Sequence, residues 1–343
     1  MIQACEAIDE LYLTYAGKFR RYHGDSLLQQ LLDVRTQAKN IRDFFLFCLG
    51  AVQMFSYFVR KRPDAFFSKG GFVCVPPGLS AAILRVPYIT HDSDQTPGLA
   101  NRIIGKWATL HATGMPAELY FRYKAHKTVY TGIPLSEDFS FVNDQSAQQM
   151  LADLTEVHTS QLLLCIGGGG GARLIDDVLE QAAEQILTNN PKLSIVHVFG
   201  KLNEHRLGGR YAELPAKLQE RVIKKTFLQD VYRYSGAATV VITRAGATNM
   251  AEFATQGKAC IVIPSDVLAS GHQVQNALTM AERKAALVLR EAELREHPGV
   301  LANAVDALLQ QPEQRREYAE RLHELARPHA ADDIARMLLK VGC

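Results

Sequence analysis

Five consecutive glycines at residues 167–171 stand between an apolar run, LLLCI, and an amphipathic stretch, ARLIDDVLEQAAEQIL. A flexible linker would have polar, Gly/Ser-rich neighbours, whereas these glycines join an expected buried strand directly to an expected helix. At such a turn backbone N–H groups can approach a phosphate closely, and the helix N-terminus adds the positive end of its dipole. A purely structural tight turn is the alternative. Arg173 lies where a P-loop would continue with Lys, which disfavours phosphoryl transfer from ATP.

A second loop of small residues, at 245–247, opens another expected helix in TRAGATNMAEFATQG. Glu252 lies in the second turn of that helix, where its carboxylate could accept hydrogen bonds from both hydroxyls of a ribose. An exposed helix residue without a ligand is the alternative for Glu252. Further on, Gln273 and Asn276 are three residues apart, so they share one helical face and offer amide groups suited to sugar hydroxyls.

The elements that would position these residues follow the pattern of βα units. From Asp64 onward, short apolar runs alternate with amphipathic stretches, which predicts parallel sheets covered by helices. Strands are expected within residues 8–19, 64–72, 87–94, 127–135, 161–166, 192–200, 238–243 and 258–265. Helices are expected at 76–85, 172–187, 247–257 with Gly257 as C-cap, and 312–339, the last split by Pro328.

Length and composition fit a two-domain globular protein. The chain has 343 residues, of which 47% are apolar and 22% charged, and its formal net charge is +2. That charge leaves no electrostatic footprint for nucleic acid. The six cysteines are scattered without a CxxC pair or zinc-ligand spacing, as expected for free thiols in a reducing cytoplasm. The opening MIQACEAIDE lacks the basic flank and apolar run of a secretory signal.

The segment at residues 44–59, FFLFCLGAVQMFSYFV, is the most apolar in the chain. As a helix its 16 residues would span roughly 24 Å, short of a hydrocarbon core of roughly 30 Å. Asp43 before it and the basic residues 60–62 after it suit the two ends of a helix dipole. Two interpretations stay open: a core helix of the first lobe, or a helix lying on a bilayer surface through residues 44–62.

Together these motifs resemble those of the MurG-like enzymes, glycosyltransferase family 28, which have the GT-B fold. Where that family carries GGSxGA, RSGA…E and HQ…NA, this chain reads GGGGGA, RAGATNMAE and GHQVQNA. In the first half, GGFVCVPPGLSAAILRVPYITHD is similar to the family's GGYVSGP stretch, and TPGLANR is similar to its PGLxNR. The resemblance covers roughly residues 64–341.

The resemblance implies an α/β protein with two Rossmann-like lobes facing across a cleft. Residues 1–135 would form an acceptor-side, membrane-facing lobe, 136–327 the nucleotide-sugar donor lobe, and 328–343 a helix packing back on the first lobe. The family's first strand and its GGTGGH loop have no counterpart here, so the first lobe is expected to be N-terminally incomplete. We expect either a misplaced start site or a partner chain that supplies this unit.

The resemblance also assigns roles in the donor site. The diphosphate would contact the glycine loop and the start of the helix expected at 247–257, and the uracil would contact two residues of FLQD. The ribose would bind Glu252, and the hexosamine would bind Gln273 and Asn276. The implied donor-binding residues are Gly168, Gly169, Gly170, Gly171, Ala172, Phe227, Leu228, Arg244, Gly246, Ala247, Thr248, Asn249, Glu252, Gln273 and Asn276. Helix dipoles and backbone amides would stabilise the departing UDP, so neither a metal ion nor a cofactor is expected, and no DxD-type pair lies beside these motifs.

The acceptor half departs further from the family. The family's HEQN is HDSD here, its GNPVR is GIPLS, and the serine of GGSxGA is Gly169. His91, Asp92 and Asp94 remain as candidates for the base that deprotonates the acceptor hydroxyl, because they follow a strand whose carboxyl end would face the cleft. A purely structural hydrogen-bonding role for His91 is the alternative.

The resulting hypothesis is an inverting, metal-independent transferase that moves N-acetylglucosamine from UDP-N-acetylglucosamine to a lipid-linked or cell-envelope glycan in peptidoglycan precursor synthesis. It would lie in the cytoplasm, peripheral on the inner face of the plasma membrane. The alternatives are a catalytically silent or partner-dependent GT-B protein, and a UDP-sugar epimerase or hydrolase. A nicotinamide dehydrogenase is disfavoured because no GxGxxG turn is followed by an acidic residue about 20 positions on, at a second strand end.

Overall fold

The structure is a computed structural model, and it describes residues 8–17, 34–155, 159–200, 209–266 and 271–343. Contacts divide the chain into two compact units, Met1–Thr131 with Asp332–Cys343, and Gly132–Ala331. We call these unit 1 and unit 2. The unit boundaries lie four residues from those expected at 135/136 and 327/328 from the sequence.

Unit 1 contains a four-stranded parallel sheet whose strands are neighbours in chain order, β1-β2-β3-β4. The strands are β1 (Phe66–Ser68), β2 (Tyr88–Asp92), β3 (Leu110–Thr113) and β4 (Thr128–Tyr130). The α-helices are α2 (Val34–Lys61), α3 (Val75–Leu84), α4 (Leu99–Ile104) and α14 (Ala330–Gly342), which begins at the end of unit 2. Short 3-10 turns are η2 (Phe72–Cys74), η3 (Gly105–Trp107), η4 (Ala117–Leu119) and η5 (Ala125–Lys127).

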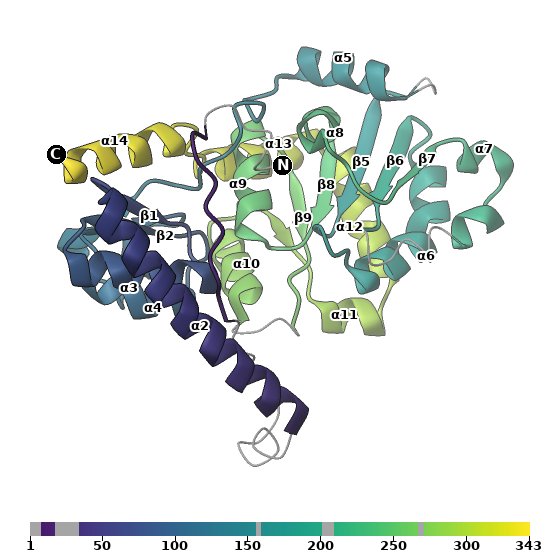
Figure 1. The fold of residues 1–343 in the computed structure, drawn as a ribbon. Coiled ribbons are helices and arrows are strands. Elements are labelled where there is room, and N and C mark those ends of the chain that lie inside the picture. Colours follow the sequence, from purple (N-terminus) through teal and green to yellow (C-terminus); the bar gives the residue numbers. More distant parts are fainter. Residues whose placement is uncertain (1–7, 18–33, 156–158, 201–208, 267–270) are drawn as a thin grey trace. The chain divides into compact units, whose positions relative to one another are not determined.

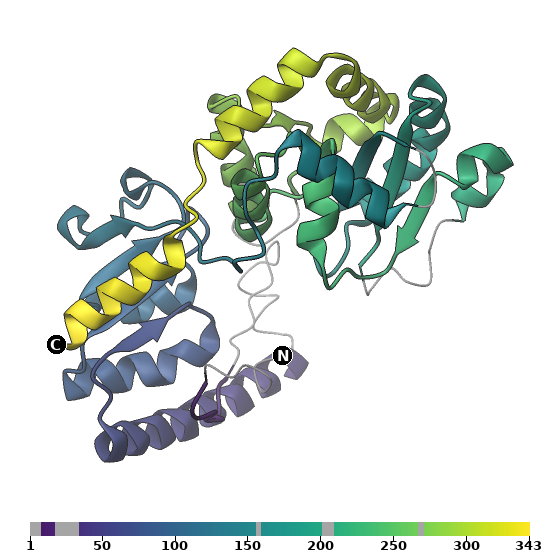
Figure 2. The ribbon, with the colours of Figure 1, turned by 90° about the horizontal axis from the view of Figure 1, so that it is seen from above.

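Helices cover both faces of this sheet, as Figure 2 shows for α14 on one side and α3 with α2 on the other. On the α14 side, Ile334 packs with Ile89 and Ala112. On the other side, Met54 and Phe58 of α2 pack in a cluster with α3 and Tyr88. Strand β2 is therefore buried along its whole length.

The strand expected at the start of the chain was wrong. Residues 8–17, part of the expected strand at 8–19, form no strand and instead run along α2. The backbone comes so close that a Cβ on Gly50 would lie 1.9 Å from the carbonyl oxygen of Tyr15. Gln53 then bridges this segment, accepting a hydrogen bond from Tyr15 N and donating one to the Leu13 carbonyl. Tyr12 of this segment also packs against Tyr57 of α2, with ring centroids 4.3 Å apart.

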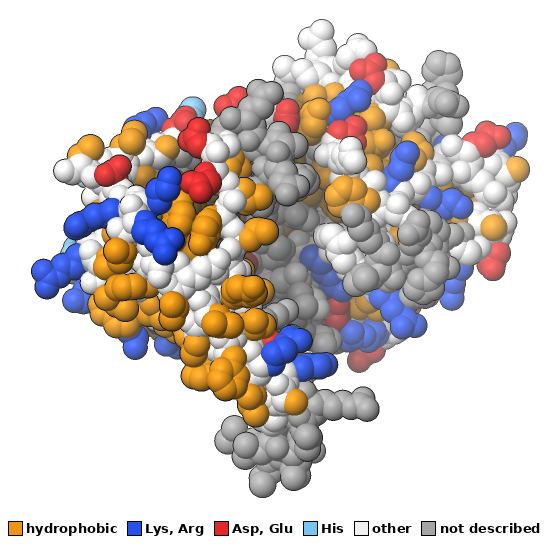
Figure 3. Space-filling model, in the orientation of Figure 1, with side chains coloured by type: hydrophobic (Ala, Val, Ile, Leu, Met, Phe, Trp, Pro, Cys, Tyr) orange, Lys and Arg blue, Asp and Glu red, His pale blue; other side chains and the backbone are white. Residues whose placement is uncertain are grey.

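Helix α2 is also longer than expected, because it extends upstream to Val34 and spans 28 residues, or about 42 Å. Asp43 therefore lies inside the helix, is 2% exposed and pairs with Arg42. By length and composition Thr36–Lys61 could cross a membrane, a test that core helices also pass. Apolar side chains left exposed along α2 recur every three or four residues, apart from the adjacent pair Phe44 and Phe45: Ile41, Phe44, Phe45, Leu49, Val52, Phe55 and Val59. Figure 3 shows hydrophobic side chains gathered over this helix, and we call these seven residues the α2 stripe.

Unit 2 contains a six-stranded parallel sheet in the order β10-β9-β8-β5-β6-β7 (Figure 1). The strands are β5 (Gln161–Ile166), β6 (Leu193–Val198), β7 (Val222–Lys225), β8 (Val240–Thr243), β9 (Cys260–Val262) and β10 (Leu287–Val288). The helices are α5 (Asp144–Leu154), α6 (Arg173–Asn189), η7 (Arg210–Glu213), α7 (Ala216–Gln219), α8 (Val231–Ala237), α9 (Ala247–Gln256), α10 (His272–Glu282), α11 (Glu291–Glu296), α12 (Gly299–Gln310) and α13 (Pro312–His323).

Strand order in unit 2 reverses direction at β5. The chain moves outward from β5 to β6 and β7, then returns to the other side of β5 with β8, β9 and β10. This is the doubly wound Rossmann order, in which ligands bind at the carboxyl ends of the strands where the order reverses. The glycine run follows β5 and the loop at 245–246 follows β8, so both of these loops lie at the switch point. The α/β fold with Rossmann-like units is thus as expected.

Candidate active site

The glycine loop takes a conformation that other residues would resist. Gly168 and Gly171 have φ angles of 94° and 81°, in the region that L side chains rarely adopt. Gly171 N donates to the Gly168 carbonyl over 2.9 Å, which closes a tight turn ahead of α6. A Cβ on Gly168 or Gly169 would meet nothing within 4 Å, so open space lies beside the loop. The loop is a turn with an accessible backbone, as a phosphate cradle requires.

Three helices begin at this edge without a capping side chain. They are α6 after β5, α9 after β8 and α10 after β9, and their N-cap residues are Ala172, Gly246 and Gly271, none of which makes a side-chain cap hydrogen bond. The three strands are neighbours in the sheet, so their carboxyl ends meet at one edge. Helix N-termini leave backbone N–H groups unpaired unless a cap or a ligand accepts from them. This edge therefore presents three sets of donors to an anion.

Glu252 lies in the second turn of α9, half-buried. Burial raises the pKa of its carboxyl to about 7, since desolvation disfavours the ionised form. Hydrogen-bond donors from a ligand would favour the carboxylate. Thr248 is exposed and Asn249 partly exposed in the first turn of the same helix, while Ala247 is buried.

Arg244 is held inside unit 2. Its Nη1 lies 2.5 Å from the Glu291 carboxylate and donates to the Ile263 carbonyl, and its side chain is 11% exposed. Glu291 in turn pairs with Arg295 at 2.8 Å. In this geometry Arg244 fixes the loop between β8 and α9, and its guanidinium is already occupied by protein groups.

Two amide side chains of α10 brace the same edge. Asn276 is 1% exposed and donates from Nδ2 to the Ala245 carbonyl over 3.0 Å, which ties α10 to the loop before α9. Gln273 Oε1 accepts from Ser265 N over 3.0 Å and so holds the loop after β9. Of this pair, Gln273 is the one that remains partly exposed.

The two residues expected to contact the uracil lie just after β7. Phe227 is 48% exposed whereas Leu228 is buried.

The three base candidates of unit 1 have different surroundings. His91 is fully buried on β2, with its ring 6.4 Å from that of Phe67. Asp92 is 5% exposed, and its carboxylate accepts from Gly98 N, Asn101 Nδ2 and the Tyr123 hydroxyl. Burial raises the pKa of Asp92, and those three donors oppose the rise. Asp94, after the strand, is the only one of the three that is not buried.

Comparison with known protein families gives two matches that follow one another along the chain. The glycosyltransferase family 28 N-terminal domain matches residues 18–113, and the family's C-terminal domain matches residues 162–334, just over half of the chain. The chain belongs to glycosyltransferase family 28.

Curated relatives support this assignment to family 28. The chain is 32% identical over 328 residues to the UDP-N-acetylglucosamine--N-acetylmuramyl-(pentapeptide) pyrophosphoryl-undecaprenol N-acetylglucosamine transferase of Treponema pallidum, covering 94% of this chain and 80% of that protein. It is 27% identical over 303 residues to the protein of the same name from Listeria monocytogenes, covering 88% and 81%.

Solved structures share the fold of this family 28 chain. MurG of Acinetobacter baumannii superposes with a TM-score of 0.66 at 22% identity, covering 85% of this chain and 77% of that one. A Staphylococcus aureus MnaA structure containing UDP superposes with a TM-score of 0.61 at 14% identity, covering 85% and 80%. At these identities the likeness concerns the fold alone, and the fold is GT-B.

Sequence patterns missed several residues that shape this edge of the unit 2 sheet. Gly200, after β6, has φ 81°, and a Cβ there would lie 2.3 Å from Gly171 N, so the two loops need glycine to approach. Asp176, in the first turn of α6, pairs with His197 Nε2 at 3.1 Å and thereby fixes the helix start against β6. His272 opens α10, and its buried Nδ1 has no partner among the described residues. Close approaches and ion pairs between distant residues leave no local motif that could have revealed them.

Proposed function

We propose that this family 28 chain transfers N-acetylglucosamine from UDP-N-acetylglucosamine to a lipid-linked peptidoglycan precursor, the reaction for which its curated relatives are named. One observation carries the proposal: helices α6, α9 and α10 begin at adjacent strand ends of the switch point, beside a glycine loop with open space around Gly168 and Gly169. Such an edge suits the two phosphates of a nucleotide sugar.

The donor would lie across this edge of unit 2, where β5, β8 and β9 end, which we call the donor edge. Amides of residues 168–172 and of the start of α9 would donate to the diphosphate, and Glu252 would accept from the ribose hydroxyls. Phe227, half exposed beyond β7, would contact the uracil. The side-chain oxygen of Gln273 holds the loop after β9, and its amide nitrogen would donate to the hexosamine. Asn276 and Arg244 would position the loop between β8 and α9.

Transfer would be a single displacement with inversion. The acceptor hydroxyl oxygen attacks the anomeric carbon, the bond from that carbon to the β-phosphate oxygen breaks, and UDP departs with the electron pair. Backbone N–H groups and helix dipoles aimed at the diphosphate stabilise the charge that develops there, so we infer that the reaction uses no metal ion. The hydroxyl proton passes to a base, and we infer Asp94 because His91 and Asp92 are buried.

The α2 stripe would hold the protein on the membrane that carries the lipid-linked acceptor. Single exposed apolar residues are common on protein surfaces, whereas seven along one helix form a contiguous apolar surface that suits a membrane. Arg60 and Lys61 in the last turn of α2 would meet anionic headgroups. The active protein would then be peripheral on the cytoplasmic face of the plasma membrane.

The proposal is tested by measuring UDP release from UDP-N-acetylglucosamine with and without a lipid-linked N-acetylmuramyl-pentapeptide acceptor in vesicles. We expect release that depends on the acceptor and that falls at least tenfold in Glu252→Gln. Equal release without acceptor would indicate a hydrolase or an epimerase-like activity. No release in either case, together with no binding of UDP-N-acetylglucosamine in calorimetry, would contradict the proposal.

A further inference from the structure

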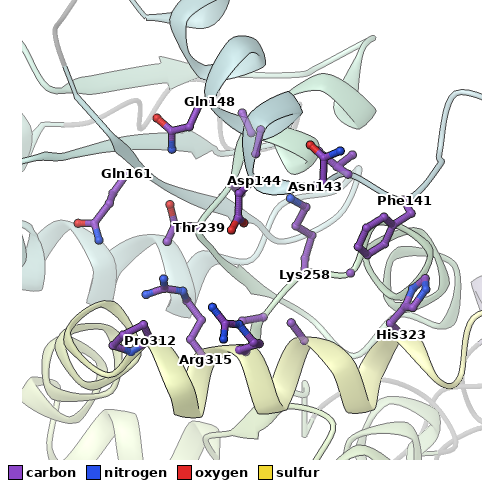
Figure 4. Close-up of a pocket in the computed structure, with 18 of the residues that line it drawn as sticks. Phe141, Asn143, Asp144, Gln148, Gln161, Thr239, Lys258, Pro312, Arg315 and His323 are labelled. Carbon is purple, nitrogen blue, oxygen red and sulfur yellow. The ribbon is translucent and has the colours of Figure 1, made fainter.

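A cavity of about 680 Å³ opens in unit 2 at the amino edge of the sheet. It lies among the residues that precede β5, β8 and β9, the start of α5, and α13, as Figure 4 shows. Its volume is in the range of small-molecule sites. The donor edge is at the other end of the strands, roughly 20 Å away along the six residues of β5. The cavity is therefore separate from the site already described.

One buried and one half-buried cation line this cavity. Lys258 is 6% exposed, and its ammonium donates to the Gly236 carbonyl over 2.6 Å. Arg315 is half-buried and donates to the carbonyls of Leu308 and Leu309. Neither cation forms a salt bridge within 4 Å with a described carboxylate. Burial lowers the pKa of Lys258 to about 8 and also lowers the pKa of Arg315.

Charged groups at the cavity leave an excess of positive charge. The basic side chains that line it are Lys258, Arg315 and Arg316, and the acidic ones are Asp144 and Glu320. Arg316 also lies 4.0 Å from the Glu313 carboxylate, so the excess of positive charge is at Lys258 and Arg315. Asp144, at the start of α5, is exposed, and its field favours the charged forms of both Lys258 and Arg315 without contacting either. Burying Lys258 and part of Arg315 without an ion-paired partner is costly, and a bound anion would offset that cost.

Neutral polar groups line the same cavity. Gln148, Gln161 and Thr239 bring amide and hydroxyl groups to one side of the cavity, whereas Phe141 and His323 pack together on the other, with ring centroids 5.0 Å apart. Amides and hydroxyls of this kind suit a ligand that carries several hydroxyl groups. An aromatic wall suits the apolar face of a sugar ring.

We propose that this cavity binds a small, hydroxyl-rich phosphate ester of the sugar-phosphate class, with its phosphate at Lys258 and Arg315. The site is independent of the transferase reaction, because none of its lining residues belongs to the donor edge. Asp144 weakens the binding of such an anion, and its removal strengthens it.

The test is calorimetry of glucose 6-phosphate binding to the full chain with the donor edge saturated by UDP. We expect a millimolar or tighter dissociation constant, at least tenfold weaker binding in Lys258→Met and in Arg315→Gln, and tighter binding in Asp144→Asn. Inorganic phosphate should bind more weakly than glucose 6-phosphate, and glucose should not bind. Unchanged UDP affinity and an unchanged circular dichroism spectrum show that each variant is folded.

Arg316→Gln provides a second measurement if the buried variants do not fold, because the Arg316 side chain is 63% exposed. We expect it to weaken glucose 6-phosphate binding about threefold. The proposal is overturned if glucose 6-phosphate does not bind at 10 mM, roughly the upper limit for a weak site, if glucose binds equally well, or if the charge variants bind like the wild type.

Discussion

The guanidinium Nη1 of Arg244 lies 2.5 Å from the carboxylate of Glu291, and both side chains are largely buried beside the loop that opens α9. Breaking a buried ion pair from one side leaves the other charge uncompensated. We expect Glu291→Gln to lower the free energy of unfolding by about 3 kcal/mol and to weaken UDP-N-acetylglucosamine binding about tenfold in calorimetry. Arg295→Gln is the matched control, because Arg295 is 52% exposed and pairs with the same carboxylate. If both variants bind the donor equally well, Glu291 does not position the loop.

Donor binding should depend on the ionisation of Glu252. Burial raises the pKa of this carboxyl to about 7, so in the free protein most of it is protonated at pH 6 and ionised at pH 8. Ribose hydroxyls favour the carboxylate, so binding strengthens as pH rises through 7. We expect the dissociation constant for UDP-N-acetylglucosamine, whose diphosphate does not titrate in this range, to fall about tenfold between pH 6 and 8. Glu252→Gln should remove this dependence, and a pH-independent wild type would refute the assignment.

Gly169 stands where the family has a serine, and the structure has room for that side chain. A Cβ there would meet nothing within 4 Å, and Gly169 is not among the glycines with positive φ. A serine hydroxyl could donate to the diphosphate, and a hydrogen bond to a charged group contributes about 1.5 kcal/mol. We therefore predict that Gly169→Ser binds UDP about tenfold more tightly. Gly200→Ala should instead weaken binding, since its Cβ would collide with Gly171 N.

Membrane binding should depend on the α2 stripe. Phe45 and Leu49 are 63% and 57% exposed, so replacing both by Asp removes apolar contact with a bilayer without opening the core. We expect this double variant to lose sedimentation with vesicles containing anionic lipid while its thermal stability stays unchanged. Leu339→Asp on α14, where the side chain is 70% exposed, should sediment like the wild type. Retained sedimentation of the double variant would exclude the stripe as the membrane contact.

Replacing Asp92 should affect stability, whereas replacing Asp94 should affect catalysis. Asp92 accepts three hydrogen bonds in a buried network, so Asp92→Asn should lower the melting temperature. Asp94 is accessible, and loss of a general base reduces kcat by roughly 10²–10⁴-fold. We expect Asp94→Asn to show that loss of kcat with unchanged UDP-N-acetylglucosamine affinity and melting temperature. Full activity in Asp94→Asn would exclude it as the base.

Sequence patterns predicted four of the six strands of unit 2, because β5, β6, β8 and β9 are largely apolar runs, whereas helices α5, α8, α11 and α12 were not expected. Strand β5 was expected at its observed bounds, and Gly257 caps α9 in the left-handed conformation, as expected. Strand β7 was missed because its VIKK ends in two exposed lysines and lacks an apolar run. Strand β3 was missed because LHAT has no clear alternation of apolar and polar residues.

Which side chains of the candidate site are accessible was harder to predict than which loops carry them. Arg244 and Asn276 belong to motifs at the donor edge, but burial directs one to Glu291 and the other to the Ala245 carbonyl. Likewise, Asp92 has the residue type of a base, and only the fold shows that Asn101 and Tyr123 occupy its carboxylate. A motif thus marks a candidate loop, while contacts between distant residues determine which of its side chains is available.

The most direct measurement is to isolate the lipid-linked product after incubation with labelled UDP-N-acetylglucosamine and an N-acetylmuramyl-pentapeptide acceptor, and to determine its anomeric configuration by NMR. The account predicts one labelled N-acetylglucosamine joined through a β linkage, because displacement inverts the α linkage of the donor. A labelled product with an α linkage would contradict the single displacement. Label recovered only as free sugar would contradict transfer itself.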